Sequence, residues 1–162
     1  MEAAEIVGGV LARVRDSRGE LIIFTQDTHQ ADYLQTPEGK KLPVPHCIEG
    51  SEGWRINQEI MDAWRNNTDT IVADELNDNT VTKPVFGSVR LVEFLSARQA
   101  EIKGIELMGL CTDICVVSNA IMLKNSLPDI PISLAEACCA GVTPKSHNEA
   151  VNTMRMCQID IV

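Results

Sequence analysis

Residues 109–116, with the sequence Gly-Leu-Cys-Thr-Asp-Ile-Cys-Val, place a thiol where a buried strand runs into a helix. The apolar residues over 105–110 predict the strand, and a helical pattern over about 115–125 follows it. A helix N-terminus lowers the pKa of a thiol below its usual value of about 8.5, because the helix dipole and its N–H groups favour the thiolate. Cys115 is therefore a candidate nucleophile whose neighbouring N–H groups can hold an oxyanion. The ordinary alternative is a buried structural cysteine.

A second set of reactive side chains follows an earlier predicted strand, at Asp27-Thr28-His29. Residues two apart in an extended chain point the same way, so Asp27 and His29 can share one ion. His46 lies in the same long polar segment. One carboxylate and two imidazoles leave coordination positions open, which is typical of a catalytic ion such as zinc, iron or manganese. The alternative is a surface loop that happens to contain two histidines.

A third candidate is Lys83, in the segment Thr82-Lys83-Pro84 that leads into a helix. The following proline favours an extended backbone at Lys83. An ammonium group at the carboxyl edge of a sheet can stabilise a nearby thiolate as its charged partner. The alternative is a solvated surface lysine.

The elements that must position these groups alternate along the chain. Apolar runs predict strands over 21–24, 70–73, 105–110, 130–135 and 159–162. Helical spacing predicts helices over 3–16, 56–64, 88–100, about 115–125 and 144–154, with a loop over 26–53. We therefore expect an α/β protein with three α/β/α layers and a mostly parallel sheet. Sites in such folds lie beyond the carboxyl ends of the strands, where the segments 25–29, 82–86 and 109–115 begin.

Length and charge limit the class of protein. The 162 residues predict one domain over 1–162, and the net charge of −9 argues against a nucleic acid or an anionic membrane as partner. We find no apolar run of membrane-spanning length and no secretory signal. The adjacent pair Cys138-Cys139 suits a reducing compartment, so we expect a cytoplasmic protein.

Several segments, taken in order, resemble one family, the isochorismatase-like cysteine hydrolases, which include the nicotinamidases. The resemblance runs from residue 2 to the end of the chain. It rests on Phe24–His29, Pro45–Gly53, Lys83 with Phe86 and Ser88, Leu110–Val116, Ala135–Cys138 and Thr143–Ala150.

The resemblance implies roles for these residues. Cys115 becomes the nucleophile and Lys83 its charged partner. A cis peptide is implied at Leu110–Cys111, with the N–H groups of Cys111 and Cys115 as the oxyanion hole. Asp27, His29 and His46 become the ligands of a divalent metal, which in the nicotinamidase branch binds the ring nitrogen of the substrate.

One departure from the family pattern concerns the general base. The family carries an aspartate at the end of its first strand, in an Asp-x-Gln-x-Asp-Phe type motif that this sequence does not contain. Either the printed chain is a shortened version of a longer protein, or the strand is truly missing, which would expose two strand edges. Without that carboxylate the thiol has no proton acceptor, so we expect little or no amidase activity from these residues alone.

The expected reaction is hydrolysis of a small, nicotinamide-like carboxamide to acid and ammonia through a cysteine thioester. Trp54 and Phe86 are candidate substrate contacts, although Trp54 can equally anchor the following helix. Alternatives are a related amidohydrolase acting on a carbamoyl or other small amide, a catalytically silent family member that acts in binding or assembly, and a redox protein using Cys138-Cys139. We also expect a homo-oligomer.

Overall fold

The computed structural model describes residues 3–162, so the first two residues of the expected domain lie outside the described part. The chain divides into two compact units. The first, called the β3–β5 unit, comprises the residues through Asp16 together with Phe86–Val162. The second, called the β1–β2 unit, is Ser17–Val85. Among residues 3–162 there is no helix with the length and apolar character needed to cross a bilayer.

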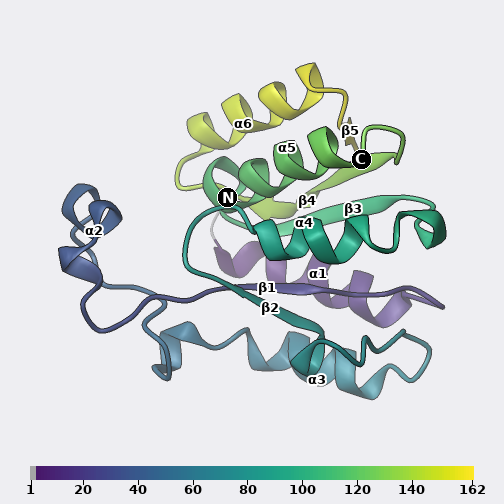
Figure 1. The fold of residues 1–162 in the computed structure, drawn as a ribbon, viewed down its shortest axis with the longest axis horizontal. Coiled ribbons are helices and arrows are strands. Elements are labelled where there is room, and N and C mark those ends of the chain that lie inside the picture. The colour runs from purple at the N-terminus through teal and green to yellow at the C-terminus, as the bar shows by residue number, and fades with distance from the viewer. Residues whose placement is uncertain (1–2) are drawn as a thin grey trace. The chain divides into compact units, whose positions relative to one another are not determined.

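The β3–β5 unit is built on a parallel sheet in the order β3-β4-β5. Its strands are β3 (Ile105–Leu110), β4 (Ile132–Ala140) and β5 (Asp160–Ile161). Its helices are α1 (Ala3–Asp16), α4 (Val89–Ser96), α5 (Val117–Ser126) and α6 (Pro144–Met156), with a 3-10 turn at Gln99–Glu101 and a π-helical turn at Thr112–Val116. Helix α1 lies on one side of the sheet, and α4 and α5 lie on the other (Figure 1). Helices on both faces explain why β3 and β4 are mostly apolar, with Glu106 and Glu136 as the charged exceptions.

Close packing sets the position of α1 on this sheet. A Cβ atom at Gly9 would lie 3.0 Å from the sulfur of Cys138 on β4, so a glycine lets the helix backbone approach the strand. Strand β4 continues five residues past the predicted end at 135. The extension is buried at Cys138, Cys139 and Ala140, and it pairs with the last residues of β3 after a bulge.

The β1–β2 unit contains two short parallel strands. They are β1 (Phe24–Asp27) and β2 (Thr80–Lys83), and their register places Asp27 opposite Lys83. Two helices, α2 (Pro37–Lys41) and α3 (Gln58–Asn66), and 3-10 turns at Tyr33–Gln35, Glu52–Trp54 and Asn77–Asn79 complete the unit. The segment 26–53, predicted to be a loop, therefore contains a short helix. Its start is favoured by the Thr36 side chain, which accepts a hydrogen bond from the Gly39 N–H.

The predictions of strands at 21–24 and 70–73 are wrong in detail. Only an isolated bridge joins Leu21 to Ile71, and β1 begins at Phe24. The cause is the fully buried side chain of Asn79. Its amide donates to the carbonyls of Ile22 and Ile71 at 2.8 and 2.9 Å and accepts from the Ala73 N–H at 2.8 Å. A side chain thus occupies backbone groups that a regular ladder would have used.

The remaining boundaries follow the predictions within a few residues. Helix α1 matches its predicted range, the helix predicted over 88–100 ends at Ser96, and the one predicted from 115 begins as the π-helical turn. All pairings between the named strands are parallel, which confirms the α/β class. Within residues 3–162 the strands form two separate sheets rather than the single sheet that we expected.

Candidate active site and metal centre

The side chains of Asp27, His29 and His46 form a cluster at the carboxyl end of β1. One potential ligand atom from each lies within 4.8 Å of the other two. Asp27 Oδ1 is 3.7 Å from His29 Nε2, and the two imidazole rings are 4.9 Å apart, centre to centre. His29 is 6% exposed, and Asp27 and His46 are half-buried. The structure therefore groups the residues that the Asp-x-His pattern and the second histidine indicated.

Backbone pairing past the end of β1 brings His46 to this point. The His29 N–H donates to the Cys47 carbonyl at 2.9 Å, and the Glu49 N–H donates to the His29 carbonyl at 2.8 Å. Cys47 itself adopts a left-handed backbone with φ of 47°, which turns the chain beside this pairing. The chain after β1 thus returns to pair with His29, which brings the neighbouring His46 to the end of β1.

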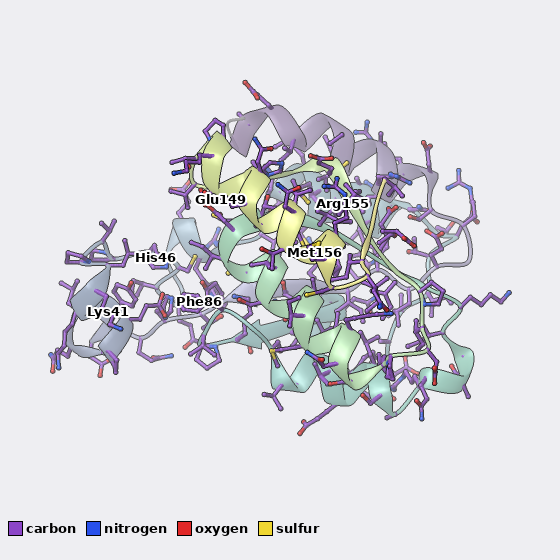
Figure 2. All side chains as sticks on the ribbon, turned by 90° about the horizontal axis from the view of Figure 1, so that it is seen from above. Lys41, His46, Phe86, Glu149, Arg155 and Met156 are labelled. Atoms are coloured by element: carbon purple, nitrogen blue, oxygen red, sulfur yellow. The ribbon has the colours of Figure 1, made fainter. Side chains whose placement is uncertain are left out.

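Two further residues belong to this cluster and were missed by the sequence analysis. Glu38 on α2 places Oε1 3.8 Å from Nε2 of both His29 and His46. Tyr33 is 1% exposed, and its ring contacts both imidazoles, at 4.7 and 5.0 Å between centroids. Burial, followed by the carboxylates of Glu38 and Asp27, raises the pKa of the Tyr33 hydroxyl, which donates to the Leu42 carbonyl. The sequence Thr36-Pro37-Glu38 is typical of a helix start, and it could have indicated that Glu38 lies on a short helix. That helix is α2, and it lies next to His46 (Figure 2).

These donors fit a divalent ion. The His46 Nδ1–H donates to the Val44 carbonyl at 2.9 Å, which leaves Nε2 as the lone-pair nitrogen directed at the cluster. Asp27 Oδ1 and His29 Nε2 are buried, and neither has a hydrogen-bond partner within the described residues. Buried polar atoms are normally satisfied, so a pair without partners among carboxylate and imidazole groups is a pattern typical of ion binding.

Lys83 ends β2 directly opposite Asp27. Its side chain is 2% exposed, its Nζ lies 3.3 Å from Asp27 Oδ1, and it donates to the Val85 carbonyl at 3.2 Å. A buried ammonium is costly unless it is paired, and the Asp27 carboxylate supplies the opposite charge. The reading of Lys83 as a solvated surface residue is therefore wrong.

The segment that carries Cys115 has an unusual backbone in the β3–β5 unit. The Leu110–Cys111 peptide is cis, at the pair for which the resemblance implies it. The π-helical turn follows, with the N–H groups of Ile114 and Val116 both donating to the Cys111 carbonyl at 3.1 Å. Helix α5 then continues in line. Cys115 lies on this turn and is half-buried.

Side chains from later in the chain hold the turn in place. The Asp113 carboxylate accepts from the Val142 N–H at 3.0 Å, and the buried Thr112 hydroxyl lies 2.9 Å from His147 Nδ1. The buried His147 on α6 thus packs against this turn. Asn119, which the sequence analysis did not single out, donates to the Cys115 carbonyl at 2.8 Å.

The two candidate substrate contacts have different surroundings. The Trp54 indole N–H donates to the Thr28 hydroxyl at 2.9 Å, and the Trp54 carbonyl accepts from the Gln26 side chain at 2.8 Å. These bonds anchor Trp54 beside β1. A contact between Trp54 and the substrate stays a prediction. Phe86 is 42% exposed.

The structure thus gathers the metal-ligand candidates with Lys83 in one unit and places Cys111 and Cys115 in the other. That the two groups line one pocket stays a prediction.

Comparisons with known proteins agree with this architecture. The nicotinamidase/pyrazinamidase PncA of Bacillus subtilis superposes with a TM-score of 0.77 over 99% of this chain and 86% of its own, at 22% identity. The zinc complex of the pyrazinamidase of Pyrococcus horikoshii superposes with a TM-score of 0.72 over 100% and 87%, at 17% identity. At these identities the likeness shows the fold.

At the level of sequence, an uncharacterized isochorismatase family protein, PncA, from Bacillus subtilis strain 168 is 26% identical over 110 residues. That match covers 67% of this chain and only 57% of the relative. The model of the isochorismatase domain matches residues 2–162, and the chain therefore belongs to the isochorismatase family.

Proposed function

We propose that this protein is a metal-assisted cysteine amidohydrolase that converts a small, nicotinamide-like carboxamide to its acid and ammonia. The observation that carries the proposal is the cluster at the ends of β1 and β2. A buried lysine, its aspartate partner and two histidines converge there, and within residues 3–162 the buried ligand atoms Asp27 Oδ1 and His29 Nε2 have no hydrogen-bond partner. Two solved structures of similar fold are a nicotinamidase/pyrazinamidase and a zinc-bound pyrazinamidase, which supports this choice of substrate class.

Cys115 is the proposed nucleophile. Its thiol proton passes to a carboxylate base, and the sulfur attacks the amide carbon. The N–H groups of Cys111 and Cys115 are the proposed donors to the oxyanion, and one such donor is worth about 2.7–4 kcal/mol in the transition state. The C–N bond then breaks, ammonia leaves with the transferred proton, and water hydrolyses the thioester to release the acid.

Lys83 and the metal ligands have complementary proposed roles. Lys83 is the cation beside the thiolate and also balances the charge of Asp27. Asp27, His29 and His46, with Glu38 as a candidate fourth ligand, would hold a zinc, iron or manganese ion. When bound, that ion supplies a Lewis acid that fixes the ring nitrogen of the substrate, directly or through water.

None of the residues proposed above is assigned as the general base that accepts the thiol proton. The family resemblance assigns it to an aspartate of a first-strand motif, and the printed sequence contains no such segment. A second candidate is a catalytically silent family member that binds the amide without turning it over. A related activity on carbamoyl compounds uses the same groups and is the third candidate.

The test combines metal analysis with an amide panel on the product of the full gene. The protein is loaded with zinc, iron or manganese, and ammonia release is measured from nicotinamide, pyrazinamide and a carbamoyl amide. We expect release from nicotinamide and its loss in Cys115→Ala. Binding of nicotinamide without release supports the silent member, and release from the carbamoyl amide alone moves the substrate class. Activity that survives in Cys115→Ala contradicts the mechanism.

A further inference from the structure

One carboxylate oxygen in the β1–β2 unit faces both a candidate metal ligand and a buried cation. Asp27 Oδ1 is 3.7 Å from His29 Nε2 and 3.3 Å from the Nζ of Lys83. All three residues belong to the same unit, and His29 and Lys83 are 6% and 2% exposed. An ion bound at the cluster of Asp27, His29 and His46 would therefore share this oxygen with the ammonium group.

The backbone fixes the position of Lys83 beside this oxygen. Strands β1 and β2 pair in a register that places Asp27 opposite Lys83, and the Thr28 N–H donates to the Lys83 carbonyl at 2.8 Å. The Lys83 ammonium donates to the Val85 carbonyl at 3.2 Å, within its own segment. Between these two residues, Pro84 restricts one backbone dihedral. A buried side chain held in this way has little room to move aside when an ion binds.

The lysine balances the charge of Asp27 without blocking its oxygen. Within residues 3–162, Asp27 Oδ1 has no hydrogen-bond partner, so its contact with the ammonium is an ion pair rather than a hydrogen bond. A carboxylate oxygen has two lone pairs that can bind a metal. Asp27 can thus accept an ion while the ammonium group stays beside it.

The ammonium group also reduces the negative charge that an ion meets. The carboxylates of Asp27 and Glu38 lie beside two imidazoles, which must be neutral to bind a metal. Lys83 offsets one of these two negative charges. A zinc ion binds a carboxylate oxygen at about 2.0–2.2 Å, so an ion on Asp27 Oδ1 would stand within roughly 5.5 Å of Nζ. Like charges at this separation repel strongly in a buried site, where salt screens little.

We propose that Lys83 lowers the affinity of the cluster for its metal ion and so keeps the ion exchangeable. The inference rests on the proposed function, because it needs an ion at Asp27, His29 and His46. It gives Lys83 a role that lies within the β1–β2 unit alone. The lysine stabilises the buried carboxylate before an ion arrives and repels the ion once it is bound.

The test changes the charge of this side chain. Lys83→Gln removes the charge and keeps a donor for the Val85 carbonyl, whereas Lys83→Arg keeps the charge. The matched control is Lys41→Gln, at an exposed position of α2, the helix that also carries Glu38 (Figure 2). The dissociation constant for zinc is measured at pH 7 on the product of the full gene, by competition with a fluorescent chelator.

Removal of the buried charge should tighten zinc binding. Lys83→Gln should bind zinc about 10- to 100-fold more tightly than the unchanged protein, because a like charge next to the ion is lost. Lys83→Arg should stay within about threefold of the unchanged protein, and Lys41→Gln within about twofold, because an exposed charge is screened by water and salt. Adding His29→Ala to Lys83→Gln should abolish the gain.

Three outcomes overturn the inference and leave the proposed metal centre standing. They are an unchanged or weaker affinity in Lys83→Gln, an equal tightening in Lys83→Arg, and an equal tightening in Lys41→Gln. A gain that survives His29→Ala places the ion elsewhere and overturns both. If the unchanged protein binds no zinc, the metal centre of the proposed function fails, and the inference fails with it.

Far-UV circular dichroism shows whether each variant is folded before zinc is added. If Lys83→Gln is unfolded, Lys83→Met replaces it, because methionine fills the buried space with an apolar chain of similar length. The same criteria then apply to Lys83→Met, with Lys41→Met as its control.

Discussion

The two polar assemblies of this protein are built in opposite ways. In the β1–β2 unit, buried ligand atoms of Asp27 and His29 have no hydrogen-bond partner within the described residues. In the β3–β5 unit, the side chains around Cys115 are tied to backbone or to one another, through Asn119, Asp113 and Thr112. The first arrangement suits the binding of an ion, and the second suits a rigid frame around a reactive atom.

Each unit nevertheless contains a buried asparagine that bonds to the backbone. Asn79 and Asn119 are both buried asparagines whose amides bond to backbone groups of separate segments. Asn79 replaces part of a strand ladder, whereas Asn119 joins a turn to a helix. An amide is suited to this role because it is a donor and an acceptor in one small group.

The largest expected effect separates the two assemblies by function. Cys115→Ala should reduce ammonia release by the full gene product about 10³-fold or more, because the nucleophile is lost. Zinc binding, measured by calorimetry, should be unchanged, since its proposed ligands belong to the other unit. Cys157→Ala, at an exposed cysteine, is the control. A joint loss of turnover and metal binding would show that the division is false.

The next effect tests the charge pair that closes the β1–β2 cluster. Lys83→Met leaves the Asp27 carboxylate without its buried partner, so the free energy of unfolding should fall by about 3–5 kcal/mol. Urea denaturation at pH 7 measures it, with Lys41→Met at an exposed position of α2 as control. Saturating zinc should restore part of the loss, because the ion also balances Asp27. A loss equal to that of the control would contradict the role of the pair.

Zinc should stabilise the folded protein by binding at the cluster of Asp27, His29 and His46. At a free zinc concentration of 100 times Kd, the free energy of unfolding should rise by about 2.7 kcal/mol, because zinc binds the folded chain alone. His29→Ala should abolish this gain, and Glu38→Gln should lower the affinity if Glu38 is a fourth ligand. Gln30→Ala, next to His29 and exposed, is the control. The same gain in His29→Ala would place the ion elsewhere.

The smallest effect tests the core of the β3–β5 unit by pH. Burial is the main cause that raises the pKa of Cys139 from 9.0 to about 11. Its contribution to stability is complete below pH 9, falls as the unfolded thiol ionises, and is lost by about pH 11. The expected loss is about 2 kcal/mol for this shift. Cys139→Ala should flatten the slope over this range, and the exposed Cys157→Ala should not. Parallel slopes in the two variants would contradict the assignment to Cys139.

Local sequence patterns were sufficient for much of this molecule. Helix α1 and strand β3 match their predicted bounds, because the spacing of apolar residues over a whole element depends on the element itself. The Asp-x-His pair at 27 and 29 likewise pointed to a shared ligand, since an extended backbone places residues two apart on one side.

The tertiary structure decided what depends on distant segments. The segments 21–24 and 70–73 do not form the predicted strands, because the Asn79 side chain bonds to their carbonyls. Strand β4 extends past its predicted end, where it pairs with the last residues of β3. Glu38 and Tyr33 joined the histidines, and Asn119 joined Phe86 to Cys115, only once the chain had folded. Sequence alone determines which side chains can act and the local backbone beneath them. Their partners depend on hydrogen bonds and packing between segments far apart in the chain, which local periodicity does not encode.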